Sequence, residues 1–334
     1  MSLHVAAVHP HHRHGWWWKT LLSGFLLWVV TIVVTVVTQN TNLVPTIILL
    51  GSFLVPFTVV LFVIERVTGT ISTMQLVTAF FVGGILGVLG ASLLEANLRQ
   101  DALLYIAVGF VEEFVKGVLL VVVAWRVRPK TARQGALLGA TVGAGFAAFE
   151  SAGYAFNAAI TSRGIDLVSL LQTEVLRAIL SPVGHVLWTA ILGAVLFGAA
   201  RGGVRLRWSW TVLVAYVGVS LLHGLWDSNS TLATLLAFVF TGTPFSAARG
   251  QFVPADVATL STTLYVVGLA VVTAIGVAVL VSVLVRHRRT DRALAAGTEA
   301  EPQRVVPPAW LDGADDARTD DGAAWERTPP PHVH

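Results

Sequence analysis

The chain has 334 residues, of which 55% are hydrophobic and 12% are charged, and its mean hydropathy is +0.73. This balance excludes an ordinary soluble domain and predicts an all-α integral membrane protein. The absence of cysteine excludes disulfides, thiolate metal sites and a cysteine nucleophile. The formal net charge of +3 says little by itself, and we expect a lipid bilayer, not nucleic acid, as the partner of this chain.

The chain begins with a short His-rich arm, residues 1–15. Its segment HPHHRH could bind a metal, but the composition is more typical of a disordered basic arm. The apolar run that follows is too long for the core of a signal peptide and is not followed by a small-residue cleavage site. We therefore expect a retained membrane span, anchored at the interface by Trp16, Trp17 and Trp18 beside Lys19.

A spanning helix needs roughly 20 mostly apolar residues. Runs of this kind predict a polytopic bundle of about eight transmembrane helices, at about residues 17–38, 44–64, 74–94, 102–125, 134–160, 174–200, 209–240 and 257–285. We take residues 16–285 as one transmembrane domain, with the polar helices at about 102–240. Residues 286–334 are predicted to be a disordered cytoplasmic tail, because the sequence beyond Arg292 becomes acidic and Pro-rich and has no hydrophobic periodicity.

Basic residues near the spans predict the orientation, because Lys and Arg favour the cytoplasmic side. Fourteen of them precede the first span or follow even-numbered spans, and four are assigned to the opposite side: Arg99, Arg163, Arg177 and Arg249. Both termini are therefore predicted to be cytoplasmic.

The fourth run contains GFVEEFVKG, in which Glu112, Glu113 and Lys116 occur where lipid-facing side chains would be expected. A charged side chain at the middle of a membrane costs about 2.5–3.5 kcal/mol, so these groups must face protein, pair or lose charge. On a helix the three lie within an arc of about 100°. Lys116 can therefore neutralise one glutamate and leave the other for a different partner.

The fifth run places small and polar residues on one helix face: Gly139, Gly143, Ala147, Glu150 and Tyr154. Small residues on such a face permit close contact with another helix. The same face carries Glu150 into the predicted contact.

The sixth and seventh runs supply two histidines. Pro182 interrupts the helical hydrogen bonds three residues before His185, and His223 lies one turn from Asp227. Glu112, Glu150 and His185 each lie about ten residues from the outer end of their run, so one buried polar site in the outer half of the membrane is expected. Other charged residues are expected at loop ends without a special role: Glu95, Arg99, Asp101, Asp166 and Glu174.

Two functions suit such a cluster: a proton or ion relay in a transporter, and a hydrolytic site that activates water. A transporter more often has internal repeats or paired broken helices, and the sequence has no repeat. Several carboxylates beside two histidines favour peptide hydrolysis, in which one carboxylate deprotonates water and other groups stabilise the oxyanion. A single intramembrane residue such as Asp227 is also often only an interhelical hydrogen bond.

Four motifs follow one another on consecutive runs: EEFVK (Glu112, Glu113, Lys116), FESAGY (Phe149, Glu150, Tyr154), a lone His185, and HGLWD (His223, Asp227). Over about residues 100–230 they resemble the PrsW family of intramembrane proteases, which is related to the type II CAAX prenyl proteases and bacteriocin-processing enzymes. The resemblance implies an endopeptidase of a bacterial-type plasma membrane that cuts single-span membrane proteins near the extracytoplasmic face. Anti-sigma factors are the best-known substrate type of the family.

By analogy with the CAAX proteases, the resemblance implies that Glu112 is the general base and that Glu150 helps to hold the water. His223 and Asp227 would polarise the substrate carbonyl. By the same analogy, Glu113 and His185 would complete the site. The supporting residues would be Lys116, Phe149 and Tyr154.

The part played by a metal stays open at this point. Zinc could be bound by His185, His223 and Glu150 with one position left open. However, the sequence has no HExxH motif, and two acids at close range already favour one proton-accepting carboxylate. No cofactor is therefore favoured, and zinc is the alternative.

Overall fold

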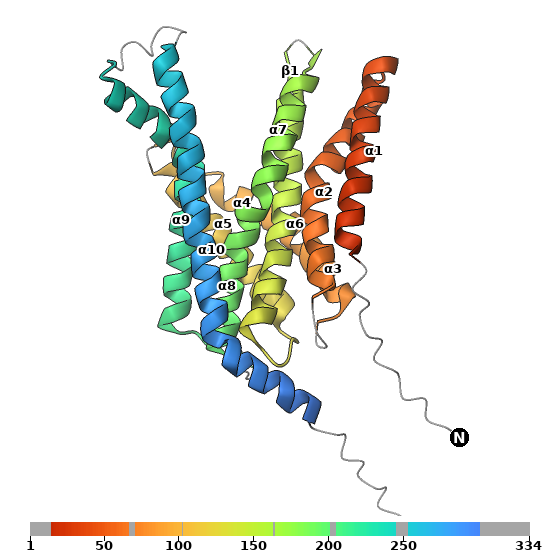
Figure 1. The fold of residues 1–334 in the computed structure, drawn as a ribbon, viewed down its shortest axis with the longest axis vertical. Coiled ribbons are helices and arrows are strands. Elements are labelled where there is room, and N and C mark those ends of the chain that lie inside the picture. Colours follow the sequence, from red (N-terminus) through yellow and green to blue (C-terminus); the bar gives the residue numbers. More distant parts are fainter. Residues whose placement is uncertain are drawn as a thin grey trace, which may run out of the picture. The chain divides into compact units, whose positions relative to one another are not determined.

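A computed structural model of the chain describes residues 15–66, 71–101, 103–162, 164–200, 205–244 and 253–300, with side chains up to residue 292 (Figure 1). The His-rich arm and the tail beyond residue 300 lie outside the described residues. The chain divides into residues 1–294 and 295–334, and the architecture below is that of the first unit.

Helices make up nearly all of the described chain. In order they are α1 (Trp16–Thr38), η1 (Thr41–Leu43), α2 (Val44–Ile64), α3 (Thr73–Phe81), η2 (Val82–Leu86), α4 (Gly87–Glu95), α5 (Leu104–Ala124), α6 (Ala132–Ala159), α7 (Leu167–Leu180), η3 (Ser181–Val183), α8 (His185–Ala199), α9 (Trp210–Thr241) and α10 (Ala255–Ala300). The strands β1 (Ile160–Thr161) and β2 (Gly164–Ile165) form a small antiparallel hairpin between α6 and α7. The predicted all-α fold is confirmed.

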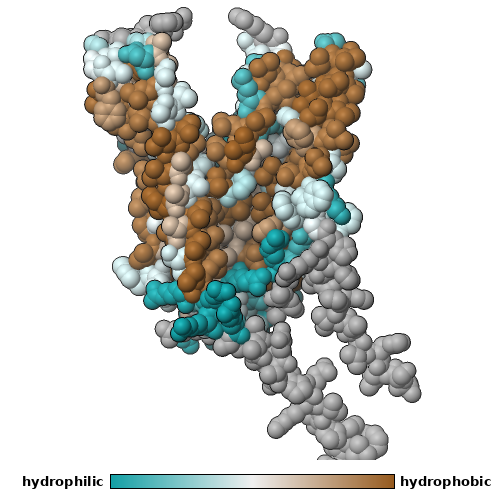
Figure 2. Space-filling view, in the orientation of Figure 1, coloured by the Kyte–Doolittle hydropathy of each residue, from teal (hydrophilic) through white to brown (hydrophobic). Residues whose placement is uncertain are grey.

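Seven helical stretches among the described residues are long and apolar enough to cross a membrane. The remaining predicted span corresponds to α5, which is 21 residues long but carries two glutamates and a lysine. Large apolar side chains are exposed along these stretches, among them Leu22 and Val37 of α1. Figure 2 shows hydrophobic surface over most of the visible face and hydrophilic residues gathered near its lower end. This distribution is what a lipid bilayer requires of a polytopic bundle.

The helix boundaries differ from the prediction in two places. The sixth run begins at Leu167 instead of residue 174, and η3 divides it into α7 and α8. Pro182 lies in η3 and cannot donate a backbone hydrogen bond, which accounts for the interruption. At the other end of the chain, α10 continues to Ala300, so residues 286–300 are helical where a disordered tail was predicted. This segment is rich in Arg and Ala, which have high helix propensity.

A second reason why α10 extends beyond residue 285 is that its later part contacts α6. Asp291 accepts hydrogen bonds from the backbone amides of Ala132 and Arg133, at 3.2 and 3.1 Å. These amides belong to the first turn of α6 and have no acceptor within their own helix, so a carboxylate is favourable there. The extension of α10 is thus tied to the beginning of α6.

The closest helix packing is between α6 and α8. A Cβ atom at Gly139 would overlap the backbone of Thr189, and one at Gly143 would overlap the backbone carbonyl of His185. Both glycines belong to the small-residue face predicted from the sequence. Because these two glycines have no side chain, the backbone at the beginning of α8 lies against the middle of α6, which fixes the position of His185.

Candidate active site

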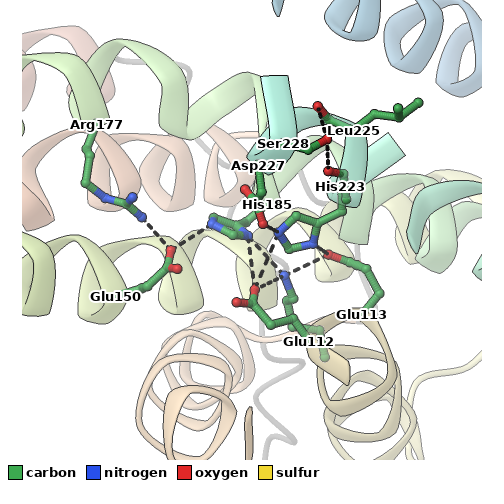
Figure 3. A network of polar contacts seen from close by, with 11 residues as sticks. Glu112, Glu113, Glu150, Arg177, His185, His223, Leu225, Asp227 and Ser228 are labelled. Carbon is green, nitrogen blue, oxygen red and sulfur yellow. Dashed lines mark hydrogen bonds and ion pairs between the residues drawn. The ribbon is translucent and has the colours of Figure 1, made fainter. Parts of the chain in front are cut away.

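Polar side chains from α5, α6, α8 and α9 converge on one buried cluster, shown in Figure 3. The six residues proposed from the sequence as catalytic are all in it: Glu112, Glu113, Glu150, His185, His223 and Asp227. Their connections are made mainly through Lys116 and the two histidine rings. The structure therefore brings together groups that are up to 115 positions apart in the chain, from Glu112 to Asp227.

Lys116 lies at the centre of the cluster and is fully buried. Its Nζ atom lies 2.7 Å from Glu113 Oε1, 3.2 Å from Glu112 Oε2 and 3.0 Å from His185 Nδ1. The ring of Phe146 covers the ammonium group, with its centroid 4.2 Å from Nζ. A buried ammonium needs all of its donors satisfied, and these three partners provide that.

His185 joins the centre of the cluster to Glu150. Because Nδ1 faces the ammonium of Lys116, that nitrogen is the acceptor, and Nε2 donates to Glu150 Oε2 at 2.8 Å. The neutral form with a proton on Nε2 satisfies both contacts. Glu150 also forms an ion pair with Arg177 of α7.

His223 has a carboxylate beside each ring nitrogen. Nδ1 lies 3.0 Å from Glu113 Oε1, and Nε2 lies 3.3 Å from Asp227 Oδ2 and 3.7 Å from Glu112 Oε2. The short contact to Glu113 fixes the ring, whereas the longer distances at Nε2 mean that this nitrogen is held less tightly and can donate to a nearer acceptor in the plane of the ring. The two histidine rings are 5.0 Å apart and nearly perpendicular.

The two adjacent glutamates have different surroundings. Glu113 is wholly buried between Lys116 and His223. Glu112 contributes instead to the lining of a cavity of about 480 Å³, together with Glu150 and Asp227. The cavity is large enough for water and for part of a peptide. Glu113 is therefore placed to fix charges, and Glu112 is placed to meet water.

Two of the predicted supporting residues have other contacts. Phe149 packs against Phe53 and Phe81, with ring centroids 5.0 and 6.3 Å away, so the structure gives it a place in an aromatic core and not in the polar cluster. Tyr154 lines the cavity, and its ring lies 4.2 Å from the guanidinium carbon of Arg177. Tyr154 thus contacts Arg177, which in turn pairs with Glu150.

Arg177 was counted from the sequence among the basic residues that flank the spans on the outer side, and its contacts in the structure were not predicted. It lies within α7, pairs with Glu150 and donates from Nε to Ser151 Oγ at 2.8 Å. These contacts were missed because the start of the sixth run was placed at residue 174 instead of Leu167, so that an arginine three residues later was read only as a flanking charge. Its spacing of eight residues before His185 was the available signal.

Glu174 was expected at a loop end, but it is 2% exposed and lies in α7. Its Oε2 accepts a hydrogen bond from Trp28 Nε1 of α1 at 2.9 Å. Gly51 of α2 makes room for this carboxylate, since a Cβ atom there would overlap it. Glu174 therefore belongs to the packing of α1, α2 and α7 and not to the polar cluster.

The cluster also fits a metal ion in donor type and spacing. Glu112, His185 and His223 each offer one ligand atom, and these atoms lie within 4.8 Å of one another. Zinc bonds of about 2.0–2.2 Å place tetrahedral ligand atoms about 3.3–3.5 Å apart, and Glu112 Oε2 is 3.7 Å from both His185 Nδ1 and His223 Nε2. The predicted carboxylate ligand, Glu150, is replaced in this set by Glu112, because Glu150 contacts the opposite nitrogen of His185.

We compared the chain with known protein families, curated proteins and solved structures, and one family model matches it. No curated protein and no solved structure matches the chain. The model of the PrsW family intramembrane metalloproteases matches residues 14–253, which include α1 to α9 and every residue of the polar cluster. The four motifs, their convergence in one buried cluster and this match agree, and the chain belongs to the PrsW family of intramembrane proteases.

Proposed function

We propose that this protease cuts membrane-anchored proteins by a glutamate-activated water, with Glu112 as the general base. The supporting observation is the difference between the two adjacent glutamates: Glu112 lines the 480 Å³ cavity, whereas Glu113 is enclosed by Lys116 and His223. A general base must reach the water from which it takes the proton. In this proposal Glu150, which lines the same cavity, accepts a hydrogen bond from the second O–H of that water.

The hydrolysis then proceeds in two steps. The water oxygen attacks the peptide carbonyl carbon while its proton passes to Glu112, and the carbonyl oxygen becomes an oxyanion. His223 donates from Nε2 to this oxyanion, and Asp227 positions the ring. The C–N bond then breaks, and the amine nitrogen takes the proton from Glu112.

The remaining residues hold these groups in place. Lys116 and Glu113 fix the charge at the centre, His185 connects Lys116 to Glu150, and Arg177 holds Glu150 from the other side. Such fixed dipoles and charges are effective in a buried site because they need no rearrangement during the reaction.

The family description includes a metal, and the donor set fits one. Zinc held by Glu112, His185 and His223 would supply a Lewis acid and a more acidic water. We favour the route without metal because the ammonium of Lys116 already lies 3.0 Å from His185 Nδ1 and 3.2 Å from Glu112 Oε2. His185 Nδ1 and Glu112 Oε2 would have to lose their contacts with the ammonium in order to bind the metal ion.

The proposed substrate is a single-span membrane protein, cut near the extracytoplasmic face of a bacterial-type plasma membrane. Anti-sigma factors are the substrate type that the family resemblance suggests. The orientation with both termini in the cytoplasm rests on the basic residues that flank the spans. In that orientation the end of α4 and the beginning of α5 are on the extracytoplasmic side, where the cavity lining includes Glu95 and Leu104.

The test is cleavage of a candidate single-span substrate by the purified full-length protein in liposomes. Glu112→Gln is expected to abolish cleavage, and Glu174→Gln, which changes another buried glutamate outside the cluster, serves as the matched control. Cleavage that survives Glu112→Gln would exclude this residue as the base. Loss of cleavage with a chelator and its recovery with zinc would exclude the metal-free route.

The transporter hypothesis has its own measurement. Liposomes containing the protein are expected to show no proton-coupled uptake. Uptake that depends on Glu112 would favour an ion relay over hydrolysis.

A further inference from the structure

The cavity at the catalytic cluster has a second acidic wall that the proposed reaction does not use. It extends from Glu112 and Glu150 to the end of α4, where Glu95, Leu98 and Gln100 contribute to its lining. The beginning of α5 forms part of the lining as well, through Leu104 and other residues up to Val108. One cavity therefore connects the proposed base to the segment between two helices, and a peptide chain reaching Glu112 would pass Glu95.

Glu95 is the unusual residue of this lining. Its Oε1 atom is shielded from solvent and has no hydrogen-bond partner among the described residues. Arg99 lies four positions further on, but the described ion pairs include none between the two. A shielded carboxylate oxygen without a donor is unfavourable until a ligand or water provides one.

The charges around the cavity indicate what kind of donor fits. Among the described residues, four carboxylates line it, from Glu95, Glu112, Glu150 and Asp227, and no lysine or arginine does. Glu150 has Arg177 as a partner, Glu112 has Lys116 and Asp227 has His223. Glu95 is thus the carboxylate of this lining without a cationic partner among the described ion pairs.

We propose that Glu95 is a specificity-determining residue that binds a lysine or arginine side chain of the substrate, a few residues from the cleaved bond. The inference rests on the proposed function, since it names the substrate class of the same site. The apolar part of the wall, from Val88, Ala91 and Leu98, would contact the neighbouring backbone and the methylene groups of that basic side chain.

This preference would be selective among membrane proteins. Lysine and arginine are less common on the extracytoplasmic side of a span than on the cytoplasmic side. In the proposed orientation, a basic residue next to the outer end of a span would distinguish a substrate from most other single-span proteins.

Binding of fluorescein-labelled Ala/Ser decapeptides to the full-length protein tests the inference. One central position carries lysine, glutamine or glutamate, and fluorescence anisotropy gives the dissociation constants. The lysine peptide is expected to bind about fivefold more tightly than the glutamine peptide, as for one partly exposed ion pair. Equal binding of the two peptides by the unaltered protein overturns the proposal without recourse to any variant.

Variants then assign the preference to Glu95. The ratio between the lysine and glutamine peptides is expected to fall to about one in Glu95→Gln, and Glu95→Lys is expected to favour the glutamate peptide. Asp101→Asn removes a charge from the same loop outside the cavity lining and is the matched control, with an unchanged ratio. A ratio that persists in Glu95→Gln, or that falls equally in Asp101→Asn, contradicts the assignment.

The same peptides separate this inference from the proposed function. Lysine-dependent binding without cleavage of any substrate would leave the role of Glu95 intact and remove the assignment of Glu112 as the base. Cleavage without a lysine preference would remove the proposed role of Glu95 and leave the assignment of Glu112 intact.

Discussion

The contact between Arg177 and Glu150 gives the sharpest test of how the cluster is held together. Arg177→Gln removes the ion pair to Glu150 and the hydrogen bond to Ser151. A hydrogen bond to a charged group contributes about 1.5–3 kcal/mol. Because the two charged side chains remain 24% and 17% exposed, water replaces part of this interaction, and we expect a loss of about 2 kcal/mol.

The loss should appear in two measurements. The free energy of unfolding in mixed micelles should decrease by about 2 kcal/mol, and the cleavage rate should fall by about thirtyfold if Glu150 must be oriented in the transition state. Arg177→Lys keeps the charge but not the fork of the guanidinium, and an intermediate loss is expected. Arg99→Gln, at an exposed arginine outside the helix, is the control and should change neither quantity.

A double-mutant cycle isolates the pair from other effects of the substitution. Arg177→Gln should cost little in a Glu150→Gln background, because no buried carboxylate is then left without its partner. A coupling energy close to zero would refute the interpretation and would assign Arg177 to packing alone. Unaltered cleavage by Arg177→Gln would show that the orientation of Glu150 does not matter to the reaction.

Three further predictions concern the helices that hold the cluster. Gly143→Ala should lower the free energy of unfolding by about 1–3 kcal/mol through overlap with α8, whereas Gly153→Ala, with nothing within 4 Å, should not; equal effects in thermal unfolding would contradict the close packing. Trp28→Phe should cost about 1–3 kcal/mol by removing the donor to buried Glu174, and Trp28→Phe combined with Glu174→Leu should recover most of it in the same assay. Hydrogen bonds from the first turn of α7 hold the pKa of Asp166 below its usual value, so its stabilisation of α7 is present above about pH 4 and lost as the pH falls through the folded-state pKa. Hydrogen exchange should show that loss in the first turn of α7, and Asp166→Asn should remove its pH dependence.

The residues of the cluster could be predicted from the sequence because charge in a membrane helix is costly. Glu112, Glu113 and Lys116 are conspicuous in an apolar run for that reason, and the spacing of His223 and Asp227 puts them on one helix face. The contact face of α6 was predictable as well, since glycines four residues apart permit close packing. These signals are local and depend only on helix geometry.

The sequence did not predict contacts that depend on where a helix begins or turns. Arg177 and Glu174 are near the predicted start of the sixth run at residue 174, whereas α7 begins at Leu167 and places both well inside the helix. The motif also could not predict the orientation of the Phe149 side chain, because that orientation depends on where α2 and α3 pack. The different surroundings of the adjacent Glu112 and Glu113 follow from the packing of α9 and not from their spacing.

The division of the sixth run by η3 also has an electrostatic consequence at the site. An uninterrupted helix would have its dipole ends at the two membrane surfaces, whereas α8 begins at His185, beside the buried cluster. The first amides of a helix carry a partial positive charge equivalent to roughly half an elementary charge. The proline-containing turn therefore places the beginning of a helix, with its partial positive charge, at His185 of the site, without the cost of inserting another ionised side chain into the membrane.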